Sequence, residues 1–186
     1  MWHISKGRSR TVVAIPSLGI AIKCARIQKR PFEGFCADLD FAYREMFPNP
    51  DPKVRKIFWE VVRASAHRAF TAFFEGFVSN WRERAYYKHA NALHRPFLQP
   101  TYFSLFGLFN VQKFGEPIDE ARSDEMYRLF HAVAGAALIR DGHHWTFANN
   151  FHLAPDGLKI LDYGNVATQK IIEEYGAALF AGLQSK

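Results

Sequence analysis

The feature that most constrains this chain is a short predicted hairpin near its C-terminal end. The segments Phe151 to Leu153 and Leu158 to Leu161 are rich in β-forming residues and are joined by a Pro-Asp-Gly sequence. Proline presets φ and Asp-Gly accepts the tight geometry that joins two strands. Because antiparallel strands return the chain to the edge where it started, we expect Asn149 and Asn150 to lie beside Asp162.

Amide and carboxylate oxygens side by side indicate a metal site. They are hard ligands of the kind that Mg²⁺ prefers when it also holds a nucleotide phosphate. The predicted ligands are Asp162 together with Asn149 or Asn150, and the sequence leaves the choice between the two asparagines open.

Composition limits the class of protein. At 186 residues the chain is long enough for one sizeable core or for two small lobes, and 48% hydrophobic residues indicate a globular chain. The net charge of +6 favours acidic partners such as nucleotides, nucleic acid or anionic lipid without choosing among them. No apolar run is long enough to span a bilayer and no signal peptide is evident, so we expect a cytoplasmic protein, with peripheral contact at the inner membrane face left open. Cys24 and Cys36 are expected to be reduced thiols.

The N-terminal segment predicts a three-stranded meander. Its strands are expected at Trp2 to Ser5, Arg10 to Ile15 and Gly19 to Ile27. Lys23 lies in the third strand. Gly7 and Ser9 lie in the first turn, together with the positively charged Arg8 and Arg10.

The middle of the chain has a helical pattern from about Lys53 to His89, with a break expected near Gly76 to Ser79. An apolar stripe recurs along it at three- and four-residue spacing, and we expect this stripe to pack in the core. A membrane-surface or partner-docking face is the alternative, favoured by basic residues on the opposite side. The stripe comprises Ile57, Val61, Ala64, His67, Ala69, Phe70, Phe73 and Phe77. The basic residues are Lys53, Arg55, Lys56, Arg63 and Arg68.

The rest of the chain predicts two short strands and two helices. The strands lie within Gln99 to Val111 and meet near Phe106-Gly107, and the helices run from about Asp124 to Ile139 and from about Thr168 to Leu183.

Two of these motifs together resemble the protein-kinase superfamily. Asp162-Tyr163-Gly164 stands in place of the Asp-Phe-Gly of kinases, with Asn149 or Asn150 in place of the catalytic-loop asparagine. Ile20-Ala21-Ile22-Lys23 is similar to the kinase strand whose lysine holds the nucleotide phosphates. The compact ending looks more like small atypical bacterial members, such as lipopolysaccharide-core sugar kinases, than like a full-size protein kinase.

The resemblance implies an α+β, two-lobed kinase-like fold with ATP and Mg²⁺ between the lobes. A β-rich N-lobe would span residues 1–111, a hinge 112–117, and a reduced, mainly helical C-lobe 118–186. The N-lobe would contain strands in 2–27, a helical insertion at about 30–75, a C-helix at about 78–90 and strands in 100–111.

The resemblance also implies roles for nucleotide-binding residues. Lys23 would hold phosphate and pair with a C-helix glutamate, for which Glu83 is our choice and Glu75 the runner-up. Gln112 and Lys113 would lie in the hinge, whose backbone groups would bind an adenine edge. Gly7 and Ser9 would contact the phosphates.

The catalytic base is the point where the sequence departs from the family. Kinases place an aspartate about five residues before the metal asparagine, but His144 lies five before Asn149. Asp141, eight residues before Asn149, serves only if the loop bulges, and His143 or His144 is the alternative base because imidazole titrates near neutral pH.

Two functions follow from the resemblance. The first is an ATP-dependent phosphotransferase that acts on a hydroxyl acceptor, which would be a sugar, a glycolipid or a protein. The alternative is a catalytically impaired pseudokinase that regulates by binding nucleotide or a partner. A basic nucleic-acid-binding module with stacking aromatic residues is a third, less expected option.

Overall fold

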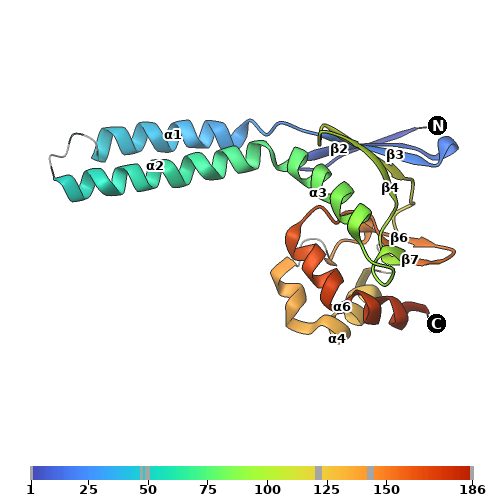
Figure 1. Cartoon of the computed structure of the whole chain (residues 1–186). Coiled ribbons are helices and arrows are strands. Elements are labelled where there is room, and N and C mark those ends of the chain that lie inside the picture. The colour runs from blue at the N-terminus through green and yellow to red at the C-terminus, as the bar shows by residue number, and fades with distance from the viewer. Residues whose placement is uncertain (1, 47, 49–50, 120–122, 142–144, 185–186) are drawn as a thin grey trace.

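The computed structural model describes residues 2–46, 48, 51–119, 123–141 and 145–184 of an α+β protein (Figure 1). A five-stranded antiparallel sheet carries a projecting pair of helices, and a second, mainly helical part contains a two-stranded antiparallel sheet. The described strands are β1 (His3–Lys6), β2 (Arg10–Ile15), β3 (Ile20–Ala25), β4 (Thr101–Leu105), β5 (Phe109–Lys113), β6 (Phe151–Ala154) and β7 (Gly157–Ile160). The described α-helices are α1 (Arg30–Met46), α2 (Pro52–Phe73), α3 (Glu75–His89), α4 (Ser123–Ala134) and α6 (Val166–Gln184).

The larger sheet has the strand order β1-β2-β3-β5-β4. Its first three strands, β1 to β3, form the predicted meander. The strand next to β3 is β5, which follows helices α1, α2 and α3 in the chain. Lys23 pairs with Asn110 across β3 and β5, and Thr101 pairs with Gln112 across β4 and β5. Because paired residues and alternate residues share a face of a sheet, these four side chains are directed to the same side.

The turn between β4 and β5 brings the sheet close to α3. Phe106 and Gly107 both have positive φ, 48° and 76°, as in the tight turns that match strand twist. A Cβ on Gly107 would lie 2.4 Å from the Phe77 carbonyl oxygen of α3. Glycine therefore permits both the turn and the close approach of the helix.

Helices α1 and α2 form an antiparallel hairpin that projects away from the rest of the molecule (Figure 1). Both helices lie between β3 and α3 in the chain. The expectation that the apolar stripe packs in the core is wrong for Ile57, Val61, Ala64, His67 and Phe70, which are exposed, whereas Ala69 of the stripe is buried. The buried residues of α2 are Phe58, Ser65 and Ala69. They face α1, because α1 is the only large surface that α2 contacts along most of its described length.

The main hydrophobic core lies in the second part of the molecule. Its aromatic centre is Trp145, which stacks on Phe97 and meets Phe130 edge-on, with ring centroids 6.3 Å and 5.2 Å apart. The strands β6 and β7 and helix α6 add Phe151, Leu158, Ile160, Ile171, Ile172 and Leu179 to this core. Other segments contribute Leu98, Met126, Leu138 and Tyr163. The predicted hairpin of β6 and β7 is therefore confirmed, with one strand face packed on this core.

Neighbouring segments fix how this hairpin sits under the larger sheet. The backbone N–H of Gln99 donates to the Ile160 carbonyl at 2.9 Å. Leu98 and Ile160 form an isolated parallel β-bridge. On the other side Pro117 bridges His152. The exit of β7, where Asp162 follows, is thereby held directly beside the start of β4.

Other element boundaries differ little from the prediction. The helical break falls at Phe74, just before the expected Gly76 to Ser79. The helix expected from Asp124 to Ile139 divides into α4 and a 3₁₀ segment, Gly135–Asp141. Within the described ranges, no helix has the length and apolar character needed to cross a membrane.

Candidate functional site: a buried charge cluster

The candidate site starts from polar residues on the inner face of the larger sheet. Lys23, Asn110 and Gln112 are buried, although strand positions facing a protein interior are usually apolar. Gly107 and Lys23 supply carbonyl oxygens to the buried Asn80 side chain of α3, each at 3.0 Å. The sheet therefore holds α3 through specific hydrogen bonds as well as packing.

Glu83 is the centre of the cluster. It lies one helical turn after Asn80 on α3, so both side chains point to the sheet. Its carboxylate is fully buried and accepts a hydrogen bond from the Lys23 ammonium at 2.9 Å and one from the Arg10 guanidinium at 2.7 Å. Asn110 donates to its second oxygen at 3.2 Å. The structure thus forms the predicted Lys23–Glu83 ion pair.

Asp162 joins the cluster from the other part of the molecule. The Arg10 guanidinium forms an ion pair with the Asp162 carboxylate as well as with Glu83. The Lys23 ammonium donates to the carbonyl of Leu161, the residue before Asp162. The predicted meeting of the Lys23 amine and the Asp162 segment is therefore present, although the chain positions are far apart.

The pKa values of the two cations respond in opposite directions. Burial lowers the pKa of the Lys23 ammonium, with Glu83 acting against this effect and Arg10 adding to it. Burial also acts to lower the pKa of Arg10, but the attraction of Asp162 and then Glu83 outweighs it, so that pKa is raised. The two cations and two carboxylates balance, which is the condition for keeping charges buried at a tolerable cost.

Tyr163 anchors the segment that carries Asp162. Its buried hydroxyl lies 2.7 Å from the Thr101 hydroxyl and donates to the Gln99 carbonyl at 2.7 Å. Burial, and then the nearby Glu83 charge, hold the pKa of the Tyr163 phenol well above its ordinary value. The adjacent Gly164 packs so closely on α3 that a Cβ would lie 2.2 Å from the Ser79 hydroxyl oxygen.

The predicted phosphate-binding turn is engaged with its own neighbours. The Gly7 N–H donates to the Arg10 carbonyl at 2.8 Å, and the Ser9 carbonyl accepts from the Arg26 N–H at 2.8 Å. A Cβ on Gly76 of α3 would lie 2.2 Å from the Ser9 carbonyl oxygen. The turn therefore packs on the start of α3.

The predicted hinge also has internal partners. The Lys113 N–H donates to the Pro100 carbonyl at 2.7 Å and the Phe114 N–H donates to the Gly19 carbonyl at 2.8 Å. The Gln99 side-chain amide donates to the carbonyls of Lys113 and Phe114, both at 3.0 Å. Gln112 points inward, with its amide 3.2 Å from the Leu161 carbonyl. An adenine edge that binds the N–H of Lys113 or Phe114 would have to replace a bond that already exists.

The predicted catalytic residues are not all brought to the cluster. Asp141 is buried, accepts a hydrogen bond from the Thr168 hydroxyl, and lies 3.5 Å from the Asn165 side-chain amide. These contacts direct its carboxylate to the start of α6. His143 and His144 lie outside the described residues.

The predicted metal ligands are close in the chain fold but not assembled as a metal site. The Asn150 carbonyl accepts from the Leu161 N–H at 2.7 Å, which places Asn150 next to the Asp162 segment, whereas Asn149 is exposed. Asp162 carries the single carboxylate of this set and binds Arg10. No group of three or more His, Cys, Asp or Glu side chains within the described ranges is arranged to hold a metal ion. As placed, these residues do not fit Mg²⁺, because the cation and Arg10 would compete for the same carboxylate.

Sequence reasoning missed the bridging role of Arg10 and the supporting roles of Asn80 and Asn110. Arg10 was expected only to add charge near a phosphate. A usable signal existed for Asn110, since it alternates with Gln112 beside the apolar Phe109 and Val111, and two polar residues on one strand face indicate a polar partner.

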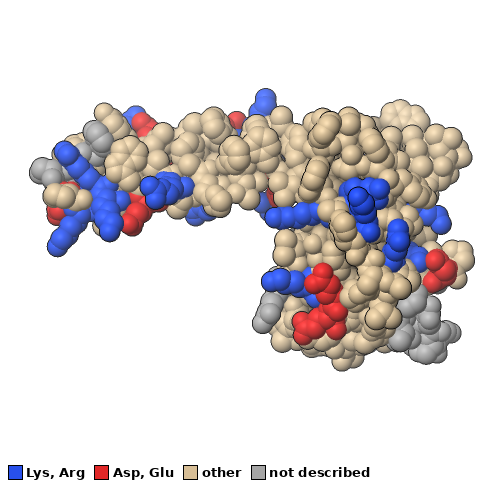
Figure 2. All heavy atoms as spheres, viewed as in Figure 1, with Lys and Arg blue, Asp and Glu red and all other residues tan. Residues whose placement is uncertain are grey.

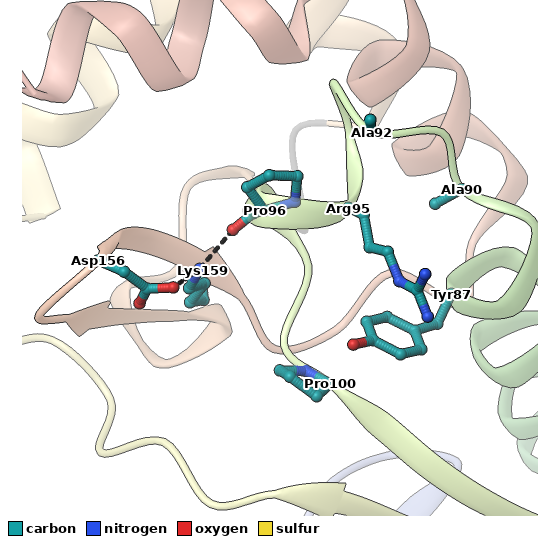
Figure 3. Close-up of a pocket in the computed structure, with 8 residues that line it drawn as sticks. All are labelled: Tyr87, Ala90, Ala92, Arg95, Pro96, Pro100, Asp156 and Lys159. Carbon is teal, nitrogen blue, oxygen red and sulfur yellow. Dashed lines mark hydrogen bonds and ion pairs between the residues drawn. The ribbon is translucent and has the colours of Figure 1, made fainter.

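A separate pocket of about 490 Å³ lies between the end of α3, the loop before β4 and the tip of the β6–β7 hairpin (Figure 3). The Arg95 guanidinium lies over the Tyr87 ring, 5.0 Å from its centroid. Lys159 donates to the Pro96 carbonyl at 2.5 Å and to Asp156 at 2.7 Å. None of the described lining residues belongs to the buried charge cluster, and both cations of the pocket are already engaged.

No protein-family model matches this chain, and neither curated proteins nor solved structures include a significant match.

Proposed function

We propose that this chain is a kinase-like, two-lobed protein that works as a regulatory binding module, with its nucleotide site closed by Arg10. The strand order of the larger sheet, the Lys23–Glu83 pair supplied by β3 and α3, and the hairpin that leads to Asp162 all support a kinase-like arrangement. The proposal of a pseudokinase instead of a phosphotransferase rests on the way the same site is occupied.

The observation that carries the proposal is the position of Arg10. Its guanidinium joins Glu83 to Asp162, so a protein cation stands where the resemblance would place the positive charge of the metal. Arginine stays charged at every physiological pH, so a change of protonation does not release it. Breaking such a buried pair costs on the order of 3–5 kcal/mol unless another charge replaces the lost partner.

The remaining contacts point in the same direction. Phosphoryl transfer needs a base within hydrogen-bond reach of the acceptor hydroxyl, and the Asp141 carboxylate is buried against Thr168 and Asn165. The backbone groups of Lys113 and Phe114 are bonded within the protein. A ligand therefore gains access chiefly by offering Arg10 an anionic group, such as a nucleotide phosphate, in exchange for Asp162.

Two measurements on the whole chain test the proposal. Calorimetric titration with ATP is run with Mg²⁺ and again with a chelator, and ATP consumption is followed over a panel of sugar, glycolipid and protein acceptors. We expect any ATP binding to be independent of Mg²⁺ and consumption to stay at the level of the Asp162→Asn variant. Mg²⁺-dependent consumption that disappears in Asp162→Asn and Lys23→Met, with both variants folded by circular dichroism, contradicts the proposal.

The second candidate is an ATP-dependent phosphotransferase, favoured by the Lys23–Glu83 distance of 2.9 Å. In that function Arg10 would leave Asp162 when a metal-bound nucleotide enters. Arg10→Met would then raise the rate of ATP consumption, because the competing cation is gone. Under the regulatory proposal the same variant leaves consumption at background.

A further inference from the structure

The α1–α2 hairpin has too little interior to account for its apolar surface. Its two helices pack on each other along a seam whose buried members, among the described residues, are Ala42, Phe58, Ser65 and Ala69. The Ser65 hydroxyl donates to Asp38 across this seam at 3.0 Å. Two helices normally bury their apolar stripes against a further layer. The rest of the molecule supplies no such layer to most of the hairpin (Figure 1).

Helix geometry sorts the exposed residues of the hairpin into two sides. A residue that follows a seam position is turned by about 100° from the seam, and in an antiparallel pair this rotation leads to the same side in both helices. Tyr43, Trp59 and Phe70 each follow a seam residue and therefore share one side. Phe41 and Ile57 each precede a seam residue and lie on the opposite side.

The side that carries Tyr43, Trp59 and Phe70, here named the aromatic side, collects several large exposed apolar residues. Phe32 and Leu39 precede Tyr43 by eleven and four residues, spacings that keep them on the same side of α1. The exposed fractions are 56% for Phe32, 36% for Leu39, 56% for Tyr43, 58% for Trp59 and 67% for Phe70. Exposed apolar surface of this extent marks an interaction site.

The charges of the hairpin indicate whether its aromatic side binds a lipid surface or a protein partner. Seven basic and six acidic residues lie within 30–73, so the hairpin is almost neutral. Attraction to an anionic bilayer is about 1 kcal/mol per basic residue near the surface, and nearby acidic residues offset it. Figure 2 shows Lys and Arg gathered at the far end of the hairpin beside acidic residues, with a largely uncharged band along its middle. The distribution therefore favours a protein partner.

The distribution of these charges between the two helices favours a second copy of the chain as the partner. Helix α1 carries two basic and four acidic residues, whereas α2 carries five basic and one acidic. A two-fold axis parallel to the hairpin would lay α1 of one copy against α2 of the other. Each acidic helix would then face a basic helix, and all neighbouring helices would be antiparallel, as in a four-helix bundle.

We propose that a second copy of this chain covers the aromatic side, so that two hairpins form an intermolecular four-helix bundle. The bundle buries Phe32, Leu39, Tyr43, Trp59 and Phe70 of both copies. This inference does not depend on the function of the charge cluster, because the hairpin projects away from it.

Sedimentation velocity on the full chain, over roughly 1 to 100 μM, tests this inference. We expect a dimer whose Kd rises about 30-fold or more in the double variant Tyr43→Ser/Trp59→Ser, since central aromatic residues dominate interface energies. The matched control is Phe41→Ser, which removes an aromatic residue of 67% exposure from the opposite side and should leave Kd within about twofold. Because opposite charges face each other, Kd should also rise with added salt.

Three results would overturn the inference. The first is a wild-type chain that stays monomeric throughout the concentration range, with co-sedimentation on phosphatidylserine vesicles assigning the hairpin to a lipid surface instead. The second is a dimer lost in Phe41→Ser but kept in the double variant, which assigns the interface to the opposite side. The third is a dimer that is insensitive to salt, which contradicts the pairing of α1 with α2 of the second copy.

Discussion

Glu83→Gln is the substitution that tests the buried charge cluster most directly. Glutamine has nearly the shape of glutamate, so the change removes a charge with little loss of packing. Glu83 is fully buried and binds both Lys23 at 2.9 Å and Arg10 at 2.7 Å. After the change Lys23 and Arg10 would face each other with Asp162 as the one carboxylate of the four-residue cluster.

The size of the effect follows from the burial of these groups. Removing one partner of a buried ion pair costs about 3–5 kcal/mol, because the remaining charge is left in a poor environment. Unfolding entropy is about 2.1 cal/mol/K per residue, or roughly 0.4 kcal/mol/K for this chain. The Tm should therefore fall by about 8–13 °C.

The assay is thermal unfolding followed by circular dichroism, and the matched control is Glu75→Gln. Glu75 lies at the start of the same helix, binds Arg8 at 3.7 Å and accepts a hydrogen bond from the Gln28 side-chain amide at 2.7 Å, but its side chain is 42% exposed and that of Arg8 is 77% exposed. Exposed pairs contribute about 0–1 kcal/mol, so the control should lower Tm by at most about 3 °C. Equal shifts for the two variants would refute the conclusion that Glu83 compensates buried cations.

Further predictions concern Tyr163 and Gly164, which follow β7, and Asp141 at the end of the 3₁₀ segment Gly135–Asp141. Gly164→Ala should cost about 1–3 kcal/mol in urea unfolding, because the new Cβ would lie 2.2 Å from the Ser79 hydroxyl oxygen, whereas Gly34→Ala in the open part of α1 should be neutral or stabilising. The raised pKa of Tyr163 contributes stability that is complete below the unfolded value of 10.0 and is lost as the pH rises further, so urea midpoints should fall more steeply above pH 10 in the wild type than in Tyr163→Phe. Parallel slopes would contradict this. Asp141→Asn should lower the free energy of unfolding by about 1–3 kcal/mol and leave ATP binding unchanged in calorimetry. Loss of ATP binding without loss of stability would show that Asp141 belongs to the nucleotide site.

Local sequence patterns predicted most elements of this protein because their causes are local. The Pro-Asp-Gly turn between β6 and β7 and the N-terminal meander depend on residues a few positions apart. The resemblance to kinases predicted a helical insertion at about 30–75, and periodicity predicted a helix from about Lys53. Ala69 of the predicted stripe is buried, but most other members of the stripe are not. Ile57 and Phe58 are both large and apolar, and only the position of α1 decides which of them is covered.

The contacts of the candidate site were likewise predicted only in part. The Lys23–Glu83 pair was predicted from the resemblance of the Lys23 strand and the Glu83 helix to those of kinases, and it agrees with the need of a buried lysine for a nearby anion. The Arg10–Asp162 contact was not predicted, since its residues are separated by most of the chain and meet only after the β7 exit docks under the sheet. The same is true of the Gln99 amide, which binds the carbonyls of the predicted hinge.

The sequence by itself determined the turns, the strands, the helices and the presence of a lysine, a glutamate and an aspartate suited to a common site. Only the tertiary structure decided that Arg10 joins the two carboxylates and that the projecting hairpin keeps its aromatic side uncovered. The physical reason is that turn and helix preferences act over a few residues. Charge pairing and burial, in contrast, depend on distances between segments that the chain brings together only when it is folded.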